Sequence, residues 1–339
     1  MAISQAGAYI LHCSSLKKYI ELYQEHRDKL LQTKVVQGQD QYELAVYATW
    51  KLSYDKLGSS ARILLQILSF LHHEGITEEI FKRAALSKTQ LENSDLQLQV
   101  TKLLMDIGRQ DASWNSWLFQ RLIGDIMSYS LVEFDNRDQS YSIHPLAQHC
   151  CTAMLGQDQF NQQKCVLSIL GLSISWSFNM EDYKYRRRLL QHITMAKRGF
   201  NAKEISDLLA ENIALVYSEQ GQWKEAEALQ VVVMEKRKDA LGEEHPDTLS
   251  SMANLAGTYK KQGQWKEAEA LEVVVMEKRK DVLGEEHPDT LSSMANLAGT
   301  YRNQGQWKEA EALEVVVMEK RKDVLGEQHP DTLSSMGAL

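Results

Sequence analysis

Cysteine is scarce in this sequence, which limits both disulfide and metal chemistry. The chain has 4 cysteines: Cys13, Cys150, Cys151 and Cys165. None of them forms a C-x-x-C pair, and the adjacent Cys150 and Cys151 do not complete a zinc-ligand spacing with the histidines just before them. We therefore expect reduced thiols in the protein core and no metal site.

Neither a surplus of basic residues nor a long apolar run is present. The chain has 38 Lys and Arg against 46 Asp and Glu, and its net charge is −8; nucleic-acid binding needs a basic face. The most apolar stretch, Val166–Phe178, is too short and too rich in serine to span a bilayer. Met1–Ile10 lacks the basic start and apolar centre of a signal peptide. We expect a cytoplasmic protein that binds neither nucleic acid nor membranes.

The sequence also lacks the loop Gly-x-x-x-x-Gly-Lys-Ser/Thr (Walker A) and any legible acidic Walker B strand. Because nucleotide phosphates need the amides and the lysine of that loop, we expect no ATP hydrolysis, no enzyme activity and no cofactor in this chain. Proline is rare, with 4 residues, and helical periodicity covers most of the length. The composition is that of a globular protein, and 339 residues allow two or three mainly α-helical domains.

A repeat with a period of 42 residues occupies the last third of the chain. Two blocks recur almost unchanged: Gly221–Glu227, Gly263–Glu269 and Gly305–Glu311 for the first, and His245–Leu249, His287–Leu291 and His329–Leu333 for the second. A fixed period of this size predicts an α-solenoid, in which each unit buries its apolar face against the next.

Each repeat contains the pattern of two helices. In the central unit, the first helix follows Pro246, with Asp247 or Thr248 as its expected N-cap, and it ends at Gly263. The second helix runs from about Trp265 to a glycine 19 residues later. Its expected apolar stripe is Ala268, Leu271, Val275 and Val282.

The pattern Leu255-Ala256-x-x-Tyr259…Gly263…Ala268 resembles the tetratricopeptide repeat, and the Leu-Gly-Glu-Glu-His-Pro-Asp-Thr connector resembles its kinesin-light-chain variety. The resemblance implies antiparallel helix pairs whose first helices line a concave groove for peptides. Residues 205–220 match the first helix at the 42-residue offset, so we expect the repeats to occupy 205–339.

Residues 41–155 predict a different, winged-helix-like domain. Short β-prone runs flank a polar turn at Asp135–Asp138, which predicts a hairpin. The helices expected around it are Leu44–Leu57, Ala61–Leu71 with a Ser59-Ser60 cap, a short helix opened by Thr77, Trp117–Tyr129 and Pro145–Leu155. Residues 87–113 are polar and read as an insertion or a long helix-loop.

Residues 156–204 read as a helical bridge. Its expected helices are Asn161–Phe178 and Tyr183–Ala196. The second carries Arg186, Arg187 and Arg188 on its polar face, where they form either a phosphate site or a solvated surface.

Three segments resemble fungal NLR-like STAND ATPases, in which an NB-ARC module precedes tetratricopeptide repeats. They are Met1–Ile10, Ala48–Tyr54 and Tyr141–Leu146. The resemblance implies that residues 1–40 are a remnant of the NB-ARC helical subdomain. It places His144 where the family's MHD-type histidine contacts the ADP β-phosphate, although only the histidine of that motif matches. ADP or ATP would then bind only with an upstream NTPase domain, and we expect the chain to be the carboxy-terminal part of a longer receptor or a truncated paralogue.

Two sets of residues are candidates for the peptide groove. Asn212, Asn254 and Asn296 occupy one position of three first helices and can bond either a peptide backbone or the adjacent repeat. The two full repeats differ at four aligned positions: Gln230/Glu272, Ala240/Val282, Lys260/Arg302 and Lys261/Asn303. Lys260, Lys261, Arg302 and Asn303 either tune recognition of an acidic or carboxylate-bearing partner or reflect neutral surface drift.

These observations favour a non-catalytic sensor segment of a STAND NLR-like signalling protein, binding a partner or ligand through the repeat groove. The alternatives are a kinesin-light-chain-like cargo adaptor or scaffold, and part of an ADP/ATP-switching NTPase whose P-loop lies outside this chain. A DNA-binding winged helix is disfavoured because Trp117–Tyr129 has Arg121 as its one basic residue. The last repeat is truncated, so we also expect fraying beyond about Gly326, or self-association through Leu333 and Met336.

Overall fold

A computed structural model describes residues 2–13, 17, 19–24, 41–87, 96–108 and 114–337. The chain divides into two compact units, Met1–Phe200 and Asn201–Leu339, and each is described by itself. No helix in the described ranges is both long and apolar enough to cross a membrane. The predicted fold class is confirmed: the protein is mainly α-helical, and a helical domain with one small hairpin precedes a solenoid of helix pairs.

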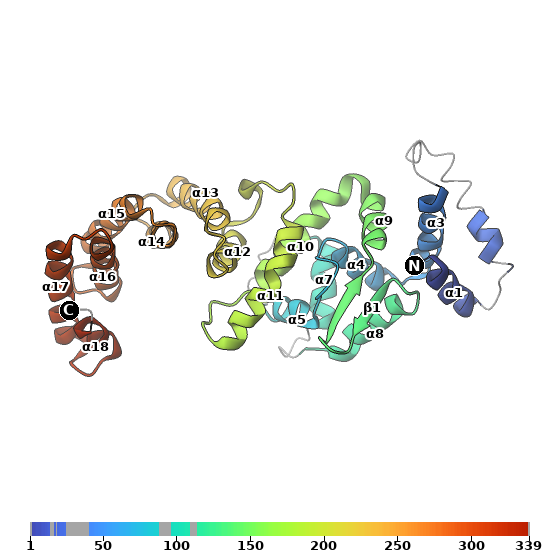
Figure 1. Cartoon of the computed structure of the whole chain (residues 1–339), viewed down its shortest axis with the longest axis horizontal. Coiled ribbons are helices and arrows are strands. Elements are labelled where there is room, and N and C mark those ends of the chain that lie inside the picture. The colour runs from blue at the N-terminus through green and yellow to red at the C-terminus, as the bar shows by residue number, and fades with distance from the viewer. Residues whose placement is uncertain are drawn as a thin grey trace. The chain divides into compact units, whose positions relative to one another are not determined.

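The first unit is helical apart from one hairpin (Figure 1). Its described elements are α1 (Ala2–Cys13), α3 (Gln41–Lys56), α4 (Ser59–Leu68), α5 (Glu78–Leu86), α7 (Leu98–Ile107), α8 (Ser116–Met127), β1 (Val132–Asp135), β2 (Ser140–Ile143), α9 (Pro145–Leu155), the 3-10 turn η2 (Gly156–Asp158), α10 (Gln159–Leu172) and α11 (Met180–Ala196).

Helices α4 and α10 form the centre of this unit. α4 packs against α7, α8, α9 and α10, and its Leu64, Leu65 and Leu68 are fully buried. α10 is buried on nearly all sides from Cys165 to Leu172. A helix that is apolar on most faces belongs in a core. α4 ends at Leu68, three residues before the predicted end at Leu71.

The predicted hairpin is present. β1 and β2 pair antiparallel, with Val132 opposite Ile143 and Phe134 opposite Tyr141. Ile76 extends this sheet, because Tyr141 N donates to Ile76 O at 2.7 Å and Ile76 N donates to Tyr141 O at 3.1 Å. The left-handed Gly75 (φ 73°) turns the chain just before this contact.

Part of 87–113 is helical, as the helix-loop alternative predicts. It contains α7, whose Val100, Leu103, Leu104 and Ile107 are buried at helical spacing among glutamines and charged residues. The serine cap of α4 is absent, because Gly58 is the N-cap and makes no side-chain bond. The sequence also predicts a helix cap at Ser14-Ser15 and a polar break at Gln37–Gln41. The cap, most of the break and the side chain of Cys13 lie outside the described residues.

The bridge also differs from its prediction. α10 ends at Leu172, six residues before Phe178. There Ser173 donates its hydroxyl hydrogen to Leu170 O at 2.6 Å, and the serine-rich stretch that follows is not helical. Arg186 was assigned to a polar face, yet it is 1% exposed and donates from Nη1 to Ser175 O and Ser177 O, each at 2.8 Å.

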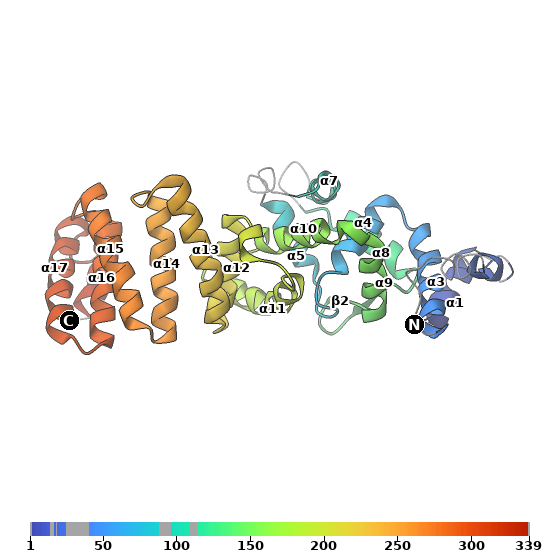
Figure 2. The same ribbon diagram turned by 90° about the horizontal axis from the view of Figure 1, so that it is seen from above.

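The second unit is a row of antiparallel helices, each packed on the next (Figures 1 and 2). Its elements are η3 (Ala202–Glu204), α12 (Asp207–Glu219), α13 (Trp223–Leu241), α14 (Pro246–Gln262), α15 (Trp265–Leu283), α16 (Pro288–Asn303), α17 (Trp307–Leu325) and α18 (Pro330–Met336). Small residues lie where paired helices meet, since Ala256 and Ala268 are both 0% exposed.

Histidine, and not aspartate or threonine, caps α14, α16 and α18. His245 Nδ1 accepts a hydrogen bond from Asp247 N at 3.2 Å, and His287 and His329 repeat the contact at 3.2 Å. The proline after each histidine has no N–H to satisfy, so the first available amide bonds to the ring. The predicted stop at Gly263 is confirmed by its left-handed conformation (φ 77°, ψ 12°). Val282, assigned to the apolar stripe, is 50% exposed.

Candidate functional site

A stripe of small and polar side chains runs along the accessible side of α14. Its members are Ser250, Ala253, Asn254, Gly257 and Lys261, all partly or fully exposed. Their spacing places them on one helical face. We call this surface the polar stripe.

The polar stripe recurs on α16, 42 residues later. The matching residues are Ser292, Ala295, Asn296, Gly299 and Asn303. A Cβ atom added at Gly257 or Gly299 would meet nothing within 4 Å, so a bound chain can approach both helix backbones closely. The two polar stripes combine amide groups with open space.

The three asparagines predicted to line the groove differ in accessibility. Asn296 is exposed, Asn254 is half-buried and Asn212 is only 2% exposed. At the position of Ala253 and Ala295, α12 carries Glu211. The polar stripe is therefore complete on α14 and α16 and altered on α12.

Lys260, predicted to face the groove, lies in a contact between the two helices of its repeat. Its Nζ is 2.8 Å from Oε1 of Glu272, a carboxylate whose side chain is 6% exposed. The other oxygen of Glu272 accepts a hydrogen bond from Thr300 Oγ1 at 2.5 Å. One buried carboxylate therefore joins α14, α15 and α16.

The same arrangement explains part of the difference between repeats. Arg302 lies 3.2 Å from Glu314, 42 residues after the Lys260–Glu272 pair. In the preceding repeat the two positions hold Ser218 and Gln230. That repeat therefore lacks the carboxylate as well as the cation. Because a buried carboxylate needs a cation nearby, the Gln230/Glu272 difference follows from the change at the neighbouring position.

The other two predicted groove residues are exposed. Lys261 forms no ion pair with any residue in the described part of the chain. Asn303 Nδ2 donates to Gly299 O within its own helix, at 2.8 Å. A hollow of about 100 Å³ opens beside the stripe of α16; its lining includes Ala295, Arg302 and Arg321. Recognition of an acidic partner by these side chains stays a prediction.

A second set of inter-helix contacts was missed in the sequence. Arg279 Nη1 donates to Asp289 O at 3.2 Å and to Ser293 Oγ at 2.9 Å. Arg321 repeats these contacts on α18. Arg237 likewise donates to Asp247 O at 3.2 Å, and it also bonds both oxygens of Glu211, at 2.7 and 2.8 Å. The sequence does contain a signal for these contacts. The second helix of each repeat has an arginine at the same position, 42 residues apart along the chain.

His144, the predicted nucleotide contact, has a structural role that resembles that of the repeat histidines. Its Nδ1 accepts from Leu146 N at 3.1 Å and caps α9, with Pro145 as the first helical residue. The ring is exposed. The cap therefore leaves the ring accessible, and a phosphate contact stays a prediction.

The described residues contain no group of three or more His, Cys, Asp or Glu that could hold a metal ion. Cys150, Cys151 and Cys165 are buried free thiols. Burial raises the pKa of the Cys151 thiol to about 12, which makes it unreactive at neutral pH.

Family models match both units. Residues 206–281 and 290–331 match models described as Tetratricopeptide repeat. Residues 52–160 match Domain of unknown function (DUF7779). The second unit therefore consists of tetratricopeptide repeats, a fold whose general role is protein–protein interaction. No curated protein matches the sequence.

Several solved structures contain chains with similarity to this one. Two of them are crystal structures of Podosopora anserina kinesin light chain nearly identical TPR-like repeats, and each is 20% identical in sequence to this chain. The matches cover 72% and 71% of this chain and 94% of each of those chains, at TM-scores of 0.40 and 0.38. A crystal structure of BtubC (BKLC) from P. vanneervenii is 15% identical and covers 55% of this chain and 76% of its own, at a TM-score of 0.39. Similarity at this level transfers no function.

Proposed function

We propose that this chain is a non-catalytic binding protein whose first repeat helices hold an extended segment of a partner protein, as the sensor part of a STAND NLR-like signalling protein. The observation that carries the proposal is the polar stripe, which recurs on α14 and α16 at the same register. Buried residues alternate with it on the same helices, including Leu255 and Leu297. Most of the polar stripe is thus left accessible for a ligand, while Ala295 also packs against the core of Leu291, Met294 and Val317.

The polar stripe fits an extended backbone. Each exposed asparagine offers a donor and an acceptor, which a peptide bond can satisfy together. The alanine and glycine positions beside Asn254 and Asn296 let the backbone come near. Lys261 adds a cation on α14, which favours a segment with a carboxylate.

The proposal assigns separate roles to the remaining parts. Residues 41–155 form a winged-helix-like domain, supported by the β1–β2 hairpin that Ile76 widens. Residues 1–40 are a remnant of an NB-ARC helical subdomain, 156–204 a helical bridge and 205–339 the repeats. The exposed ring of His144 contacts a nucleotide only when an upstream NTPase domain supplies it.

A second candidate is a kinesin-light-chain-like cargo adaptor or scaffold. The observation that favours it is the histidine-capped connector, which recurs with one geometry before α14, α16 and α18. Under either candidate, Leu333 and Met336 on α18, which are 49% and 39% exposed, offer apolar surface for self-association.

A peptide-array screen with the whole chain tests the proposal. We expect a subset of extended, acidic peptides to bind, and the double variant Asn254→Ala/Asn296→Ala to lose most of that binding. The matched control is Asn136→Ala/Gln328→Ala, which removes two exposed amides away from the polar stripe. Unchanged binding in the first variant, with the fold intact by circular dichroism, refutes a role for the polar stripe.

A further inference from the structure

One face of α11 is strongly basic in a chain whose net charge is −8. An open groove of about 650 Å³ lies along this helix. Its lining residues are His72, Lys184, Arg187, Arg188, Leu190, Gln191, Thr194, Met195 and Arg198. Four of these nine are Lys or Arg and none is acidic, so the groove concentrates positive potential against the overall charge.

The arginines of this groove are available for a ligand. Arg187, Arg188 and Arg198 are exposed and form no ion pair with any residue that the structure describes. Lys184 pairs with Glu181 at 3.0 Å, but both side chains are more than half exposed, and such a pair is worth little. The neighbouring Arg186 differs, because it is buried on backbone carbonyls.

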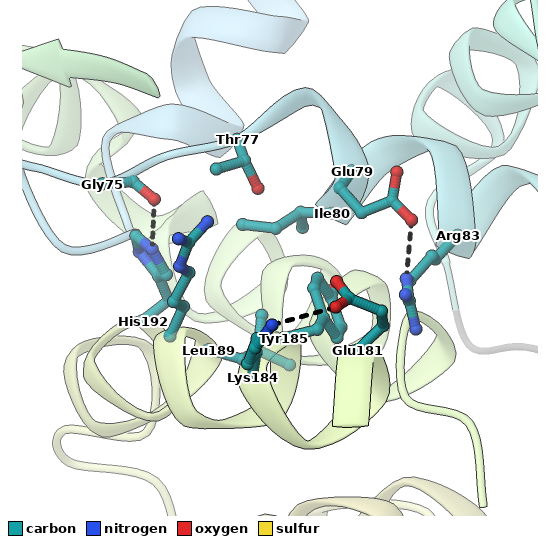
Figure 3. Close-up of a pocket in the computed structure, with 11 residues that line it drawn as sticks. Gly75, Thr77, Glu79, Ile80, Arg83, Glu181, Lys184, Tyr185, Leu189 and His192 are labelled. Carbon is teal, nitrogen blue, oxygen red and sulfur yellow. Dashed lines mark hydrogen bonds and ion pairs between the residues drawn. The ribbon is translucent and has the colours of Figure 1, made fainter. Parts of the chain in front are cut away.

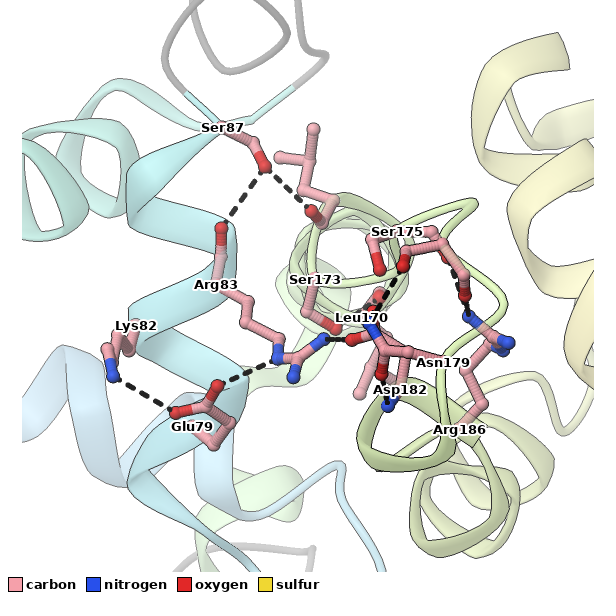
Figure 4. Close-up of polar contacts among 12 residues, drawn as sticks. Glu79, Lys82, Arg83, Ser87, Leu170, Ser173, Ser175, Asn179, Asp182 and Arg186 are labelled. Atoms are coloured by element: carbon pink, nitrogen blue, oxygen red, sulfur yellow. Dashed lines mark hydrogen bonds and ion pairs between the residues drawn. The ribbon is translucent and has the colours of Figure 1, made fainter. Parts of the chain in front are cut away.

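The helix that carries these cations packs on α10 and is tied to α5 through Arg83. Arg83 bonds Glu79 at 2.8 Å and also Asp182 at the start of α11 (Figure 4). Its guanidinium lies 4.1 Å from the ring centroid of Tyr185. The hydrogen bond from Arg83 lowers the pKa of Asp182. A fixed helix presents its basic side chains without a large entropic cost on binding.

A second hollow of about 220 Å³ adjoins the groove and shares Lys184 and Arg188 with it. Ile80, Tyr185 and Leu189 give it an apolar wall (Figure 3). Two acids also line this hollow: Glu79 pairs with Arg83, and the exposed Glu181 lies 3.0 Å from Lys184.

His192 supplies a specific polar group in this second hollow. Its side chain is 1% exposed, and Nε2 is 3.1 Å from Gly75 O (Figure 3). The buried Nδ1 has no hydrogen-bond partner in the described part of the chain. Because Gly75 O can only accept, Nε2 carries the proton, and Nδ1 is an acceptor without a donor.

We propose that the α11 groove and the hollow beside it bind a small polyol that carries two or more phosphate groups. Arg187 and Arg188 match phosphate oxygens in bidentate geometry, and Lys184 adds a third charge. A hydroxyl of the ligand donates to Nδ1 of His192. The groove has the size of a small-molecule site, whereas a long nucleic acid would also meet the net negative charge of the chain.

Calorimetry on the whole chain tests this site with inositol trisphosphate and with pyrophosphate, which has phosphates but no polyol. We expect inositol trisphosphate to bind about tenfold tighter than pyrophosphate, and Arg187→Gln/Arg188→Gln to weaken it by about tenfold or more. The matched control, Lys56→Gln/Lys102→Gln, removes two exposed cations elsewhere in the first unit and should leave the affinity unchanged.

Vesicles with and without phosphatidylinositol bisphosphate distinguish a lipid source of the headgroup from a soluble one; binding from either source supports the site. An equal loss of affinity in the two variants would overturn the proposal. So would the absence of heat with inositol trisphosphate, equal affinity for pyrophosphate, or tighter binding of a single-stranded oligonucleotide. A thermal melt of each variant confirms that the first unit is folded.

Discussion

The contact among α14, α15 and α16 gives the sharpest test of how the repeats stack. We consider Lys260→Met, which removes the cation and keeps most of the apolar stem. Glu272 would then remain buried, with its side chain 6% exposed, and would keep Thr300 as a hydrogen-bond donor. A buried carboxylate that loses its cation is destabilised by the cost of desolvation.

The size of the effect follows from the exposure of the pair. An exposed ion pair contributes about 0.2–1 kcal/mol, whereas breaking a buried pair costs about 3–5 kcal/mol. The side chain of Lys260 is 24% exposed and that of Glu272 is 6% exposed, so the pair lies between these cases. We expect Lys260→Met to lower the opening free energy of α15 and α16 by about 2 kcal/mol. Lys261→Met, its exposed neighbour, should cost less than about 0.5 kcal/mol.

The chain itself contains the compensating pair. Ser218 and Gln230 occupy the same two positions one repeat earlier, so Lys260→Ser combined with Glu272→Gln should recover most of the stability that Lys260→Ser alone loses. Amide hydrogen exchange on the whole chain measures the opening free energies of α15 and α16 directly. It does not require that the two units unfold together. Additive effects of the two substitutions would refute the coupling.

Three further predictions concern a pKa, a backbone conformation and nucleotide binding. Burial lowers the pKa of His192 to about 4, so between that value and about 6.5 the unfolded chain binds the extra proton. The opening free energy of α11 from amide hydrogen exchange should therefore fall by about 2 kcal/mol from pH 7 to pH 5. The same pH dependence in His192→Gln would contradict this. Gly263→Ala, at φ 77°, should cost about 1 kcal/mol in urea unfolding, whereas Gly257→Ala inside α14 should be neutral or stabilising; equal effects would disprove the conformational argument. Calorimetry should detect no binding of ADP to the isolated chain, and micromolar affinity would overturn the dependence on an upstream domain.

The repeats were predictable because their units are nearly identical in sequence. Comparing the units shows the length of the period, the two helices of each unit and the residues at which the helices end. Gly263 is legible as a stop because only glycine enters the left-handed region easily. The caps were not legible, because histidine is uncommon among N-cap residues and competes with Asp247 and Thr248 in the same string. Aspartate instead occupies the second helical position and donates its amide to the ring.

The candidate site was only partly predictable. Asn254, Asn296 and Lys261 are accessible as expected. The pairing of Lys260 with Glu272 joins neighbouring helices, and helix periodicity within α14 cannot show which residue of α15 faces it. The burial of Arg186 likewise depends on the distant carbonyls of a non-helical segment. In both cases the missing information is tertiary.

Photo-crosslinking of a bound peptide tests the central claim, that the polar stripe is a binding surface. A peptide selected on the array is given a photoreactive residue at its centre and is crosslinked to the whole chain, and the sites are mapped by mass spectrometry. The account predicts crosslinks within Pro246–Gln262 and Pro288–Asn303, the helices that carry the polar stripe. Crosslinks confined to α13, α15 and α17, or to the first unit, would contradict it.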